Sequence, residues 1–169
     1  MIKYYISKNP AILFVGINPH FGSYHRGVPF SNNKMFWYLL SEAGIIKETR
    51  EFLRDDAKLK NLYTTISKKY KINFINIIDK PTKNVSQLKK GEENKGVKRL
   101  AKIIENKKPK VVCFIGKVTF SNFKGNNKIR FGLQGKIFDS IVYVMHFPIR
   151  GYASVRVKEL KTVKKLAGL

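Results

Sequence analysis

The stretch "AILFVGINPH", residues 11–20, decides the fold class of this chain. Five apolar residues run into a glycine, and an asparagine, a proline and a histidine follow shortly after. A continuous apolar run that ends in glycine is typical of a strand buried on both faces of a parallel sheet. Ligands collect at the carboxyl ends of such strands, so the polar cluster lies where a ligand is expected to bind.

The rest of the chain alternates between strand and helix patterns. Further strands are expected at "INFINII" (72–78) and "KVVCFIG" (110–116), and "KIFDS" with "IVYVMHF" (141–147) predicts a hairpin or a last strand. Helical spacing covers residues 33–45, 92–108 and 152–169, with a loosely helical segment at 47–70 and a short helix after Gly116. The pattern predicts a single α/β domain over residues 1–169, a three-layer αβα sandwich with a central, mostly parallel four-stranded sheet.

The charge balance points to a polyanionic partner. The chain has 34 Lys and Arg against 11 Asp and Glu, a formal net charge of +23. Residues 106–138 contain seven lysines and Arg130 but no carboxylate. Such a basic stretch is typical of nucleic-acid binding, although composition does not separate DNA from RNA, and a generally basic surface without a specific partner is the alternative. No apolar run is long enough for a membrane span, so a cytoplasmic protein without membrane contact is expected.

Several classes of chemistry lack their residues. The single cysteine, Cys113, has apolar neighbours and is expected to be a buried structural thiol. One cysteine excludes a disulfide framework, a Cys-ligated zinc site and an iron–sulfur cluster. The phosphate loop GxxxxGK[ST], the dinucleotide fingerprint GxGxxG and the hydrolase elbow GxSxG are all absent. The three histidines have no carboxylate beside them in sequence, so neither a metal nor a cofactor is expected.

Three motifs in order carry a resemblance to a known family. They are "GINP" (16–19), "GVPF" (27–30) and "NKMFW" (33–37). This combination resembles the uracil-DNA glycosylase superfamily, in particular its mismatch-specific uracil/thymine branch, and the similarity extends over about residues 11–160. The resemblance implies an enzyme that flips uracil out of DNA and hydrolyses its N-glycosidic bond, leaving an abasic site. No lysine is a convincing Schiff-base former, so we expect a monofunctional enzyme.

The resemblance also implies roles for individual residues. Asn18 matches the residue that positions the attacking water, with a turn-capping asparagine as the alternative. Phe30 matches the ring that stacks on the flipped base, with a core phenylalanine as the alternative. Trp37 and Phe36 are expected to pack beneath that loop. The residues expected to bind the substrate base are Gly16, Ile17, His20, Phe30 and Asn33.

The chain departs from the branch at two places. His20 stands where the branch usually has glycine, and an imidazole there is expected to exclude the methyl group of thymine, unless it turns outward to a phosphate. "HFPIRGYAS" (146–154) replaces a motif that normally contains asparagine. His146 is the expected counterpart, a catalytic hydrogen-bond donor to charge developing on the base, with a purely structural histidine as the alternative.

The remaining expectations concern DNA. The predicted DNA contacts are Lys117, Arg150, Gly151, Tyr152 and Ser154, of which residues 150–152 form the expected intercalation loop. The predicted partner is double-stranded DNA, with single-stranded DNA as a second candidate and no obligate protein partner. Two alternatives remain open: a glycosylase for another deaminated base such as hypoxanthine or xanthine, and a catalytically inactive nucleic-acid-binding module of the same fold.

Overall fold

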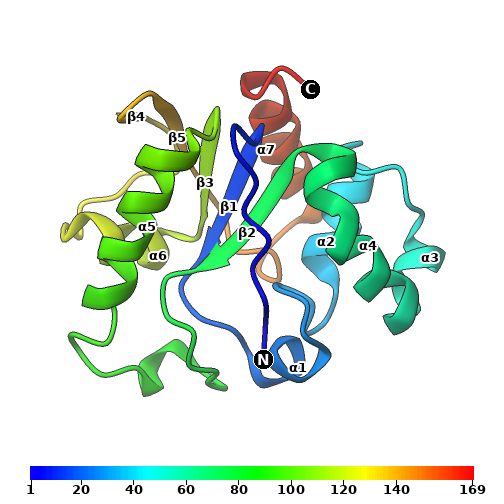
Figure 1. The fold of residues 1–169 in the computed structure, drawn as a ribbon, viewed down its shortest axis with the longest axis horizontal. Coiled ribbons are helices and arrows are strands. Elements are labelled where there is room, and N and C mark those ends of the chain that lie inside the picture. The colour runs from blue at the N-terminus through cyan, green and yellow to red at the C-terminus, as the bar shows by residue number, and fades with distance from the viewer.

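A five-stranded sheet forms the centre of the molecule (Figure 1). The computed structural model describes residues 1–169. The strands lie in the order β2-β1-β3-β5-β4. Their bounds are β1 (Ile12–Gly16), β2 (Ile72–Asn76), β3 (Val111–Ile115), β4 (Gly132–Ile137) and β5 (Ser140–Met145). The four neighbours β2, β1, β3 and β5 are parallel, which confirms the predicted mostly parallel sheet.

The predicted number of strands was wrong, because β4 adds a fifth. It pairs antiparallel with β5 at the edge of the sheet, with a register shift between Leu133 and Gly135. Its sequence, "GLQGKI", contains two glycines and no apolar run, and none of its residues is fully buried. An edge strand needs no two-sided apolar pattern, so the rule that finds buried strands does not give its bounds. The alternative of a hairpin between "KIFDS" and residues 141–147 is confirmed, because β4 and β5 form it.

Seven α-helices and one short 3₁₀ turn connect the strands. The helices are α1 (Phe21–Arg26), α2 (Met35–Glu42), α3 (Arg50–Arg54), α4 (Asp56–Tyr70), α5 (Asn94–Lys107), α6 (Lys117–Lys124) and α7 (Ala153–Leu166), and the 3₁₀ turn is η1 (Val85–Gln87). The short α1 was not expected, because "FGSYHR" carries no helical apolar period. None of the helices combines the length and the apolar character that crossing a membrane requires.

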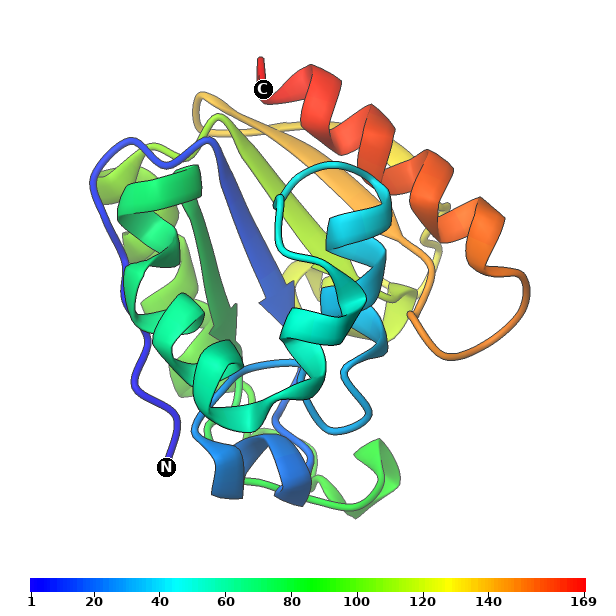
Figure 2. The same ribbon diagram turned by 90° about the vertical axis from the view of Figure 1, so that its right-hand side faces the viewer.

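Two hydrophobic cores, one on each face of the sheet, make the structure a three-layer sandwich. Ile12 and Phe14 of β1 pack into a core shared with α2, α4 and α7. Leu13 and Val15 point the other way, into a core shared with α5 and α6. The turned view shows α2, α4 and α7 in front of the sheet (Figure 2). The continuous burial of β1, β2 and β3 follows from this two-sided covering.

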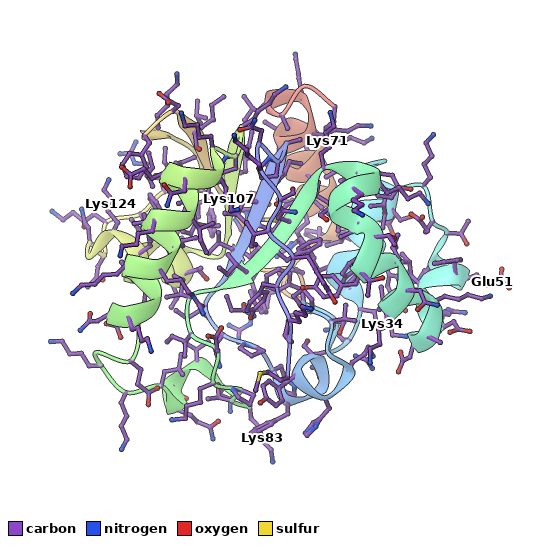
Figure 3. The ribbon with its side chains drawn as sticks, viewed as in Figure 1. Lys34, Glu51, Lys71, Lys83, Lys107 and Lys124 are labelled. Atoms are coloured by element: carbon purple, nitrogen blue, oxygen red, sulfur yellow. The ribbon has the colours of Figure 1, made fainter.

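The carboxyl ends of β1 and β2 point to the edge of the molecule where α1 lies (Figure 1). Lys83, in the segment after β2, lies at this edge, whereas Lys71, which precedes β2, lies at the opposite one (Figure 3). The motif that follows β1 is therefore grouped with the segment after β2. This edge holds the candidate site.

Candidate functional site

Asn18 is held by the segment that follows β2. Its Nδ2 donates to Thr82 Oγ1 over 2.8 Å and to the carbonyl oxygen of Lys80 over 3.1 Å. The backbone reinforces this contact, since Thr82 N–H donates to the Pro19 carbonyl oxygen over 3.1 Å. With Nδ2 fixed on these acceptors, Oδ1 is the atom left to accept a hydrogen bond from a ligand or a water molecule. The side chain is therefore oriented by a neighbouring segment and does more than cap its own turn.

Phe30 has a strained backbone. Its φ is +56°, in the left-handed region that bulky residues rarely adopt. The neighbouring residues fix this conformation: Trp37 Nε1 donates to the Pro29 carbonyl oxygen over 2.9 Å, and Ser31 N–H donates to Ser23 Oγ over 3.0 Å. Strain that the surroundings hold in place is typical of binding sites.

The Phe30 ring lies over the end of β1. It packs edge to face against Phe36 and Phe74, with ring centroids 5.2 Å and 6.0 Å away. A Cβ placed on Gly16 would collide with the Phe30 ring and with Asn76 Oδ1. Only glycine therefore allows the ring to approach the strand this closely. Phe30 remains partly exposed, while Phe36 and Trp37 are buried beneath it as predicted.

Two main-chain donors border this ring. Neither Ile17 N–H nor Phe30 N–H donates to a backbone acceptor of the protein. The carbonyl oxygen of Ile17, by contrast, accepts from Ile78 N–H over 2.8 Å, which fixes the direction of its peptide. Free N–H groups beside an aromatic ring match the acceptor oxygens of a pyrimidine base.

Asn76 is a candidate residue that the sequence reasoning missed. It is fully buried at the end of β2, opposite Gly16 in the sheet register. Its Nδ2 donates to Tyr4 Oη over 2.9 Å, but its Oδ1 has no hydrogen-bond partner. Burial raises the pKa of Tyr4 to about 12, so this anchor stays uncharged at physiological pH. Buried polar atoms are nearly always paired, so the unpaired Oδ1, which lies against Gly16 near the Phe30 ring, is a candidate contact for a ligand.

Asn73, in the same strand, shows the contrast. Its Oδ1 accepts from both the N–H and the hydroxyl of Ser7 over 3.1 Å, and its Nδ2 donates to the Ile72 carbonyl oxygen. Asn73 is thus satisfied within the protein and is structural. An asparagine as the last residue of an apolar strand, as in "INFIN", is the signal that could have identified Asn76.

His146 directly follows β5 and is tied to α7. Its Nδ1 lies 2.7 Å from Glu159 Oε1, and its backbone N–H donates to Glu159 Oε2 over 3.0 Å. Phe131, from the segment before β4, stacks on the imidazole with ring centroids 3.5 Å apart. Lys117 Nζ lies 4.4 Å from the centroid of the Phe131 ring. The imidazole is therefore fixed at one nitrogen and covered on one face, and Nε2 is the ring nitrogen left for a ligand.

Arg156 anchors the segment between β5 and α7 through hydrogen bonds to its backbone. This arginine is buried, and its guanidinium donates to the carbonyl oxygens of Phe147 (3.0 Å) and Tyr152 (2.8 Å). Gly151 has a φ of +77° and lies directly against the guanidinium. The two ends of the loop are thus fixed while its apolar side chains face solvent: Phe147, Ile149 and Tyr152 are 49%, 53% and 83% exposed. A rigid loop with exposed apolar side chains suits insertion into a base stack.

His20 and Asn33 both make local contacts. His20 Nδ1 accepts from Gly22 N–H over 3.2 Å and thereby caps α1. Asn33 is exposed, and its Oδ1 accepts from Met35 N–H over 3.1 Å at the start of α2. Each side chain thus has a structural role, and their roles toward a substrate remain predictions.

The predicted DNA-binding residues Lys117, Arg150, Gly151, Tyr152 and Ser154 are all exposed. The acid-free stretch 106–138 does not form one face. Lys107 ends α5 beside the start of the strands, where its carbonyl oxygen accepts from Asn9 N–H, whereas Lys117 begins α6 at their carboxyl ends.

Cys113 is buried, and burial raises the pKa of its thiol well above its usual value. No group of three or more His, Cys, Asp or Glu side chains could hold a metal ion.

One comparison with known proteins bears on this site. The family model described as the uracil DNA glycosylase superfamily matches residues 3–161. The match includes β1 through β5 and most of α7, and it therefore contains every side chain of the candidate site.

Proposed function

Because the chain belongs to the uracil DNA glycosylase superfamily, we propose that it is a monofunctional enzyme that excises uracil from DNA. Membership in the superfamily supports DNA glycosylase activity, and hence a DNA substrate and a role in DNA repair. The choice of uracil, and of U·G pairs as in the mismatch-specific branch, belongs to the proposal. The observation that carries it is Asn18, whose amide nitrogen is anchored on Thr82 and Lys80 so that its oxygen is free to accept a hydrogen bond.

Three kinds of contact at this site match uracil. Phe30 supplies a flat stacking surface, and the free N–H groups of Ile17 and Phe30 are donors for the uracil carbonyl oxygens. Asn76 Oδ1 is an acceptor for the N3–H of uracil. Cytosine has a lone pair at N3 instead, so the buried oxygen would repel it. This donor and acceptor pattern favours uracil over the normal base.

The reaction follows from the same groups. A water molecule that donates a hydrogen bond to Asn18 Oδ1 attacks C1′ of the deoxyribose. The C1′–N1 bond breaks, and its electron pair stays on uracil N1. An amide is a poor base, so the water loses its proton only after the sugar has become strongly cationic. That proton ends, through solvent, on N1 of the released uracil anion, which closes the balance. In this proposal His146 Nε2, the ring nitrogen not used by Glu159, stabilises negative charge on the departing base. The products are free uracil and an abasic site.

The proposal is tested with a panel of labelled oligonucleotides. Duplexes with U·G, U·A, T·G or hypoxanthine and a single strand with uracil are incubated with the protein and analysed before and after alkali. Cleavage only after alkali, and best for uracil, is the expected result. Highest activity on hypoxanthine would show that the preferred substrate is a deaminated base other than uracil. Binding without any cleavage would indicate an inactive binding module, and cleavage before alkali would contradict a monofunctional enzyme.

DNA affinity is expected to fall steeply with salt, because phosphate contacts by lysine and arginine displace counterions. With about four such contacts, affinity drops roughly 100-fold between about 50 and about 200 mM salt. Lys117→Ala should reduce the slope of the log–log plot by about one, since this residue lies at the carboxyl ends of the strands.

Lys107→Ala is the matched control for this measurement, because Lys107 lies at the opposite end of the sheet. Its slope should equal that of the wild type. Fluorescence anisotropy titrations at several salt concentrations give the slopes. An equal decrease in slope for both variants, or a nearly flat wild-type plot, would contradict DNA binding at the edge of the sheet that holds the candidate site.

His20 is expected to act as a steric gate against thymine. A close-packed site that rejects one methyl group discriminates by about 1–3 kcal/mol, so wild-type protein should excise uracil from U·G roughly 5- to 150-fold faster than thymine from T·G. His20→Gly should reduce this ratio. Because His20 also caps α1, His20→Asn is the control that keeps a capping side chain and removes the imidazole bulk.

Both His20 variants should relax the ratio if the gate is steric. If only His20→Gly does so, loss of the cap is the cause. Equal wild-type rates on T·G and U·G would show that no gate exists.

A further inference from the structure

Glu159 is a buried carboxylate whose only ionisable partner is His146. It is 8% exposed on α7, and neither lysine nor arginine lies within ion-pair distance of it. Both of its oxygens are used on one residue, Oε1 on the imidazole Nδ1 and Oε2 on the backbone N–H. A buried carboxylate without hydrogen bonds is strongly unfavourable, so this pair is a defined structural unit.

The two contacts together fix which imidazole nitrogen carries the proton. A carboxylate oxygen only accepts, so Nδ1 must be the donor to Glu159. A neutral His146 then has its lone pair on Nε2, and Nε2 donates only when the ring is protonated. We infer that Glu159 is a positioning residue, which holds His146 so that its outward nitrogen donates to the departing base as an imidazolium. The inference rests on the proposed function for its kinetic consequence, but not for the tautomer.

The surroundings leave no other group to balance Glu159. Cys113 and Tyr143 lie on the sheet beneath Glu159. Burial raises the pKa of both side chains, that of Tyr143 to about 12, so both remain neutral at physiological pH. On α7, the guanidinium of Arg156 is directed to the carbonyl oxygens of Phe147 and Tyr152.

From the other side, Phe131 separates the imidazole from the ammonium group of Lys117. Glu159 contacts the imidazole directly, with its Oε1 2.7 Å from Nδ1.

Glu159→Gln separates positioning from charge. The backbone N–H of His146 still needs an acceptor, so the glutamine oxygen takes that place and its NH₂ group faces Nδ1. Nδ1 must then accept, and the proton of the neutral ring moves to Nε2. The variant therefore turns a neutral His146 into a donor at Nε2 without a positive charge.

The test is a histidine tautomer measurement by ¹⁵N–¹H NMR on the wild type and on Glu159→Gln. The resonances are assigned by comparison with His20→Gln and His25→Gln variants, and Glu105→Gln, an exposed residue of α5, is the matched control. The wild type should carry its proton on Nδ1 in the neutral form, and Glu159→Gln on Nε2. A wild-type neutral ring protonated at Nε2 would overturn the inference, even if the variant did not fold.

Kinetics provide the second measurement. Because only an imidazolium donates from Nε2 in the wild type, its single-turnover uracil excision should fall about tenfold or more as the pH is raised from about 6 to about 9. Excision by Glu159→Gln should be nearly independent of pH over that range, and Glu105→Gln should behave as the wild type. Equal pH profiles for the wild type and Glu159→Gln would contradict the inference. Absence of excision at every pH would contradict the proposed function instead, and the tautomer would then decide the role of Glu159 alone.

Discussion

Replacing Asn18 by alanine is expected to lower the single-turnover rate of uracil excision from a U·G duplex by roughly 100-fold, the usual effect of removing one positioned polar group from a transition state. Duplex affinity should remain nearly unchanged, because the proposed mechanism gives Asn18 a contact with the water and none with a phosphate. Its Nδ2 contacts to Thr82 and Lys80 indicate that the protein fixes the direction of Oδ1 before substrate arrives.

Thr82 provides a sharper test of this preorganisation. Thr82→Val removes the hydroxyl that holds Asn18 at 2.8 Å, while Thr82→Ser keeps it. The valine variant should lose about tenfold in rate and the serine variant almost nothing. Asn106→Ala, at an exposed position, is the control for Asn18→Ala. A loss below tenfold for Asn18→Ala would remove this residue from the central role.

Asn76→Ala is expected to have an effect of similar size, roughly 100-fold on excision, because the buried Oδ1 is complementary to the N3–H of uracil. The substitution also removes the hydrogen bond to Tyr4, which could act through stability alone. Tyr4→Phe removes the same hydrogen bond but leaves Asn76 Oδ1 in place, and it should retain most of the activity.

The comparison of these two variants decides the role of Asn76. Thermal unfolding measured alongside shows how much stability each one loses. If Tyr4→Phe reduces excision as strongly as Asn76→Ala, the role of Asn76 is structural and it does not recognise the base through a hydrogen bond.

The sequence predicts the parallel sheet well because β1, β2 and β3 are covered on both faces. A strand such as Ile12–Gly16 must be apolar throughout, and this is a strong local signal. The extent of β4 escapes prediction, although a hairpin at "KIFDS" is one of the two interpretations that the sequence allows, because an edge strand is specified by its pairing with β5 and not by its own side chains. The helix α1 escapes for a related reason, since it is fixed by the His20 cap and carries no apolar stripe.

The residues of the candidate site likewise differ in how far the sequence could predict them. Asn18 and Phe30 stand in contiguous motifs, so their roles could be proposed from the sequence. Asn76 is hidden inside a strand pattern, and only the pairing with Gly16 shows that its oxygen is buried without a partner. Glu159 reads as one charge among the lysines of a terminal helix, and its contact with His146 depends on how α7 packs against the sheet.

The most direct measurement of the central claim is the identity and amount of the product. Wild-type protein in excess over a U·G duplex is followed by mass spectrometry for the free base, together with the strand before and after alkali. We predict one free uracil per duplex and one alkali-labile site, with the strand intact until alkali is added. Bound but unchanged duplex, or a strand broken without release of uracil, would contradict the account.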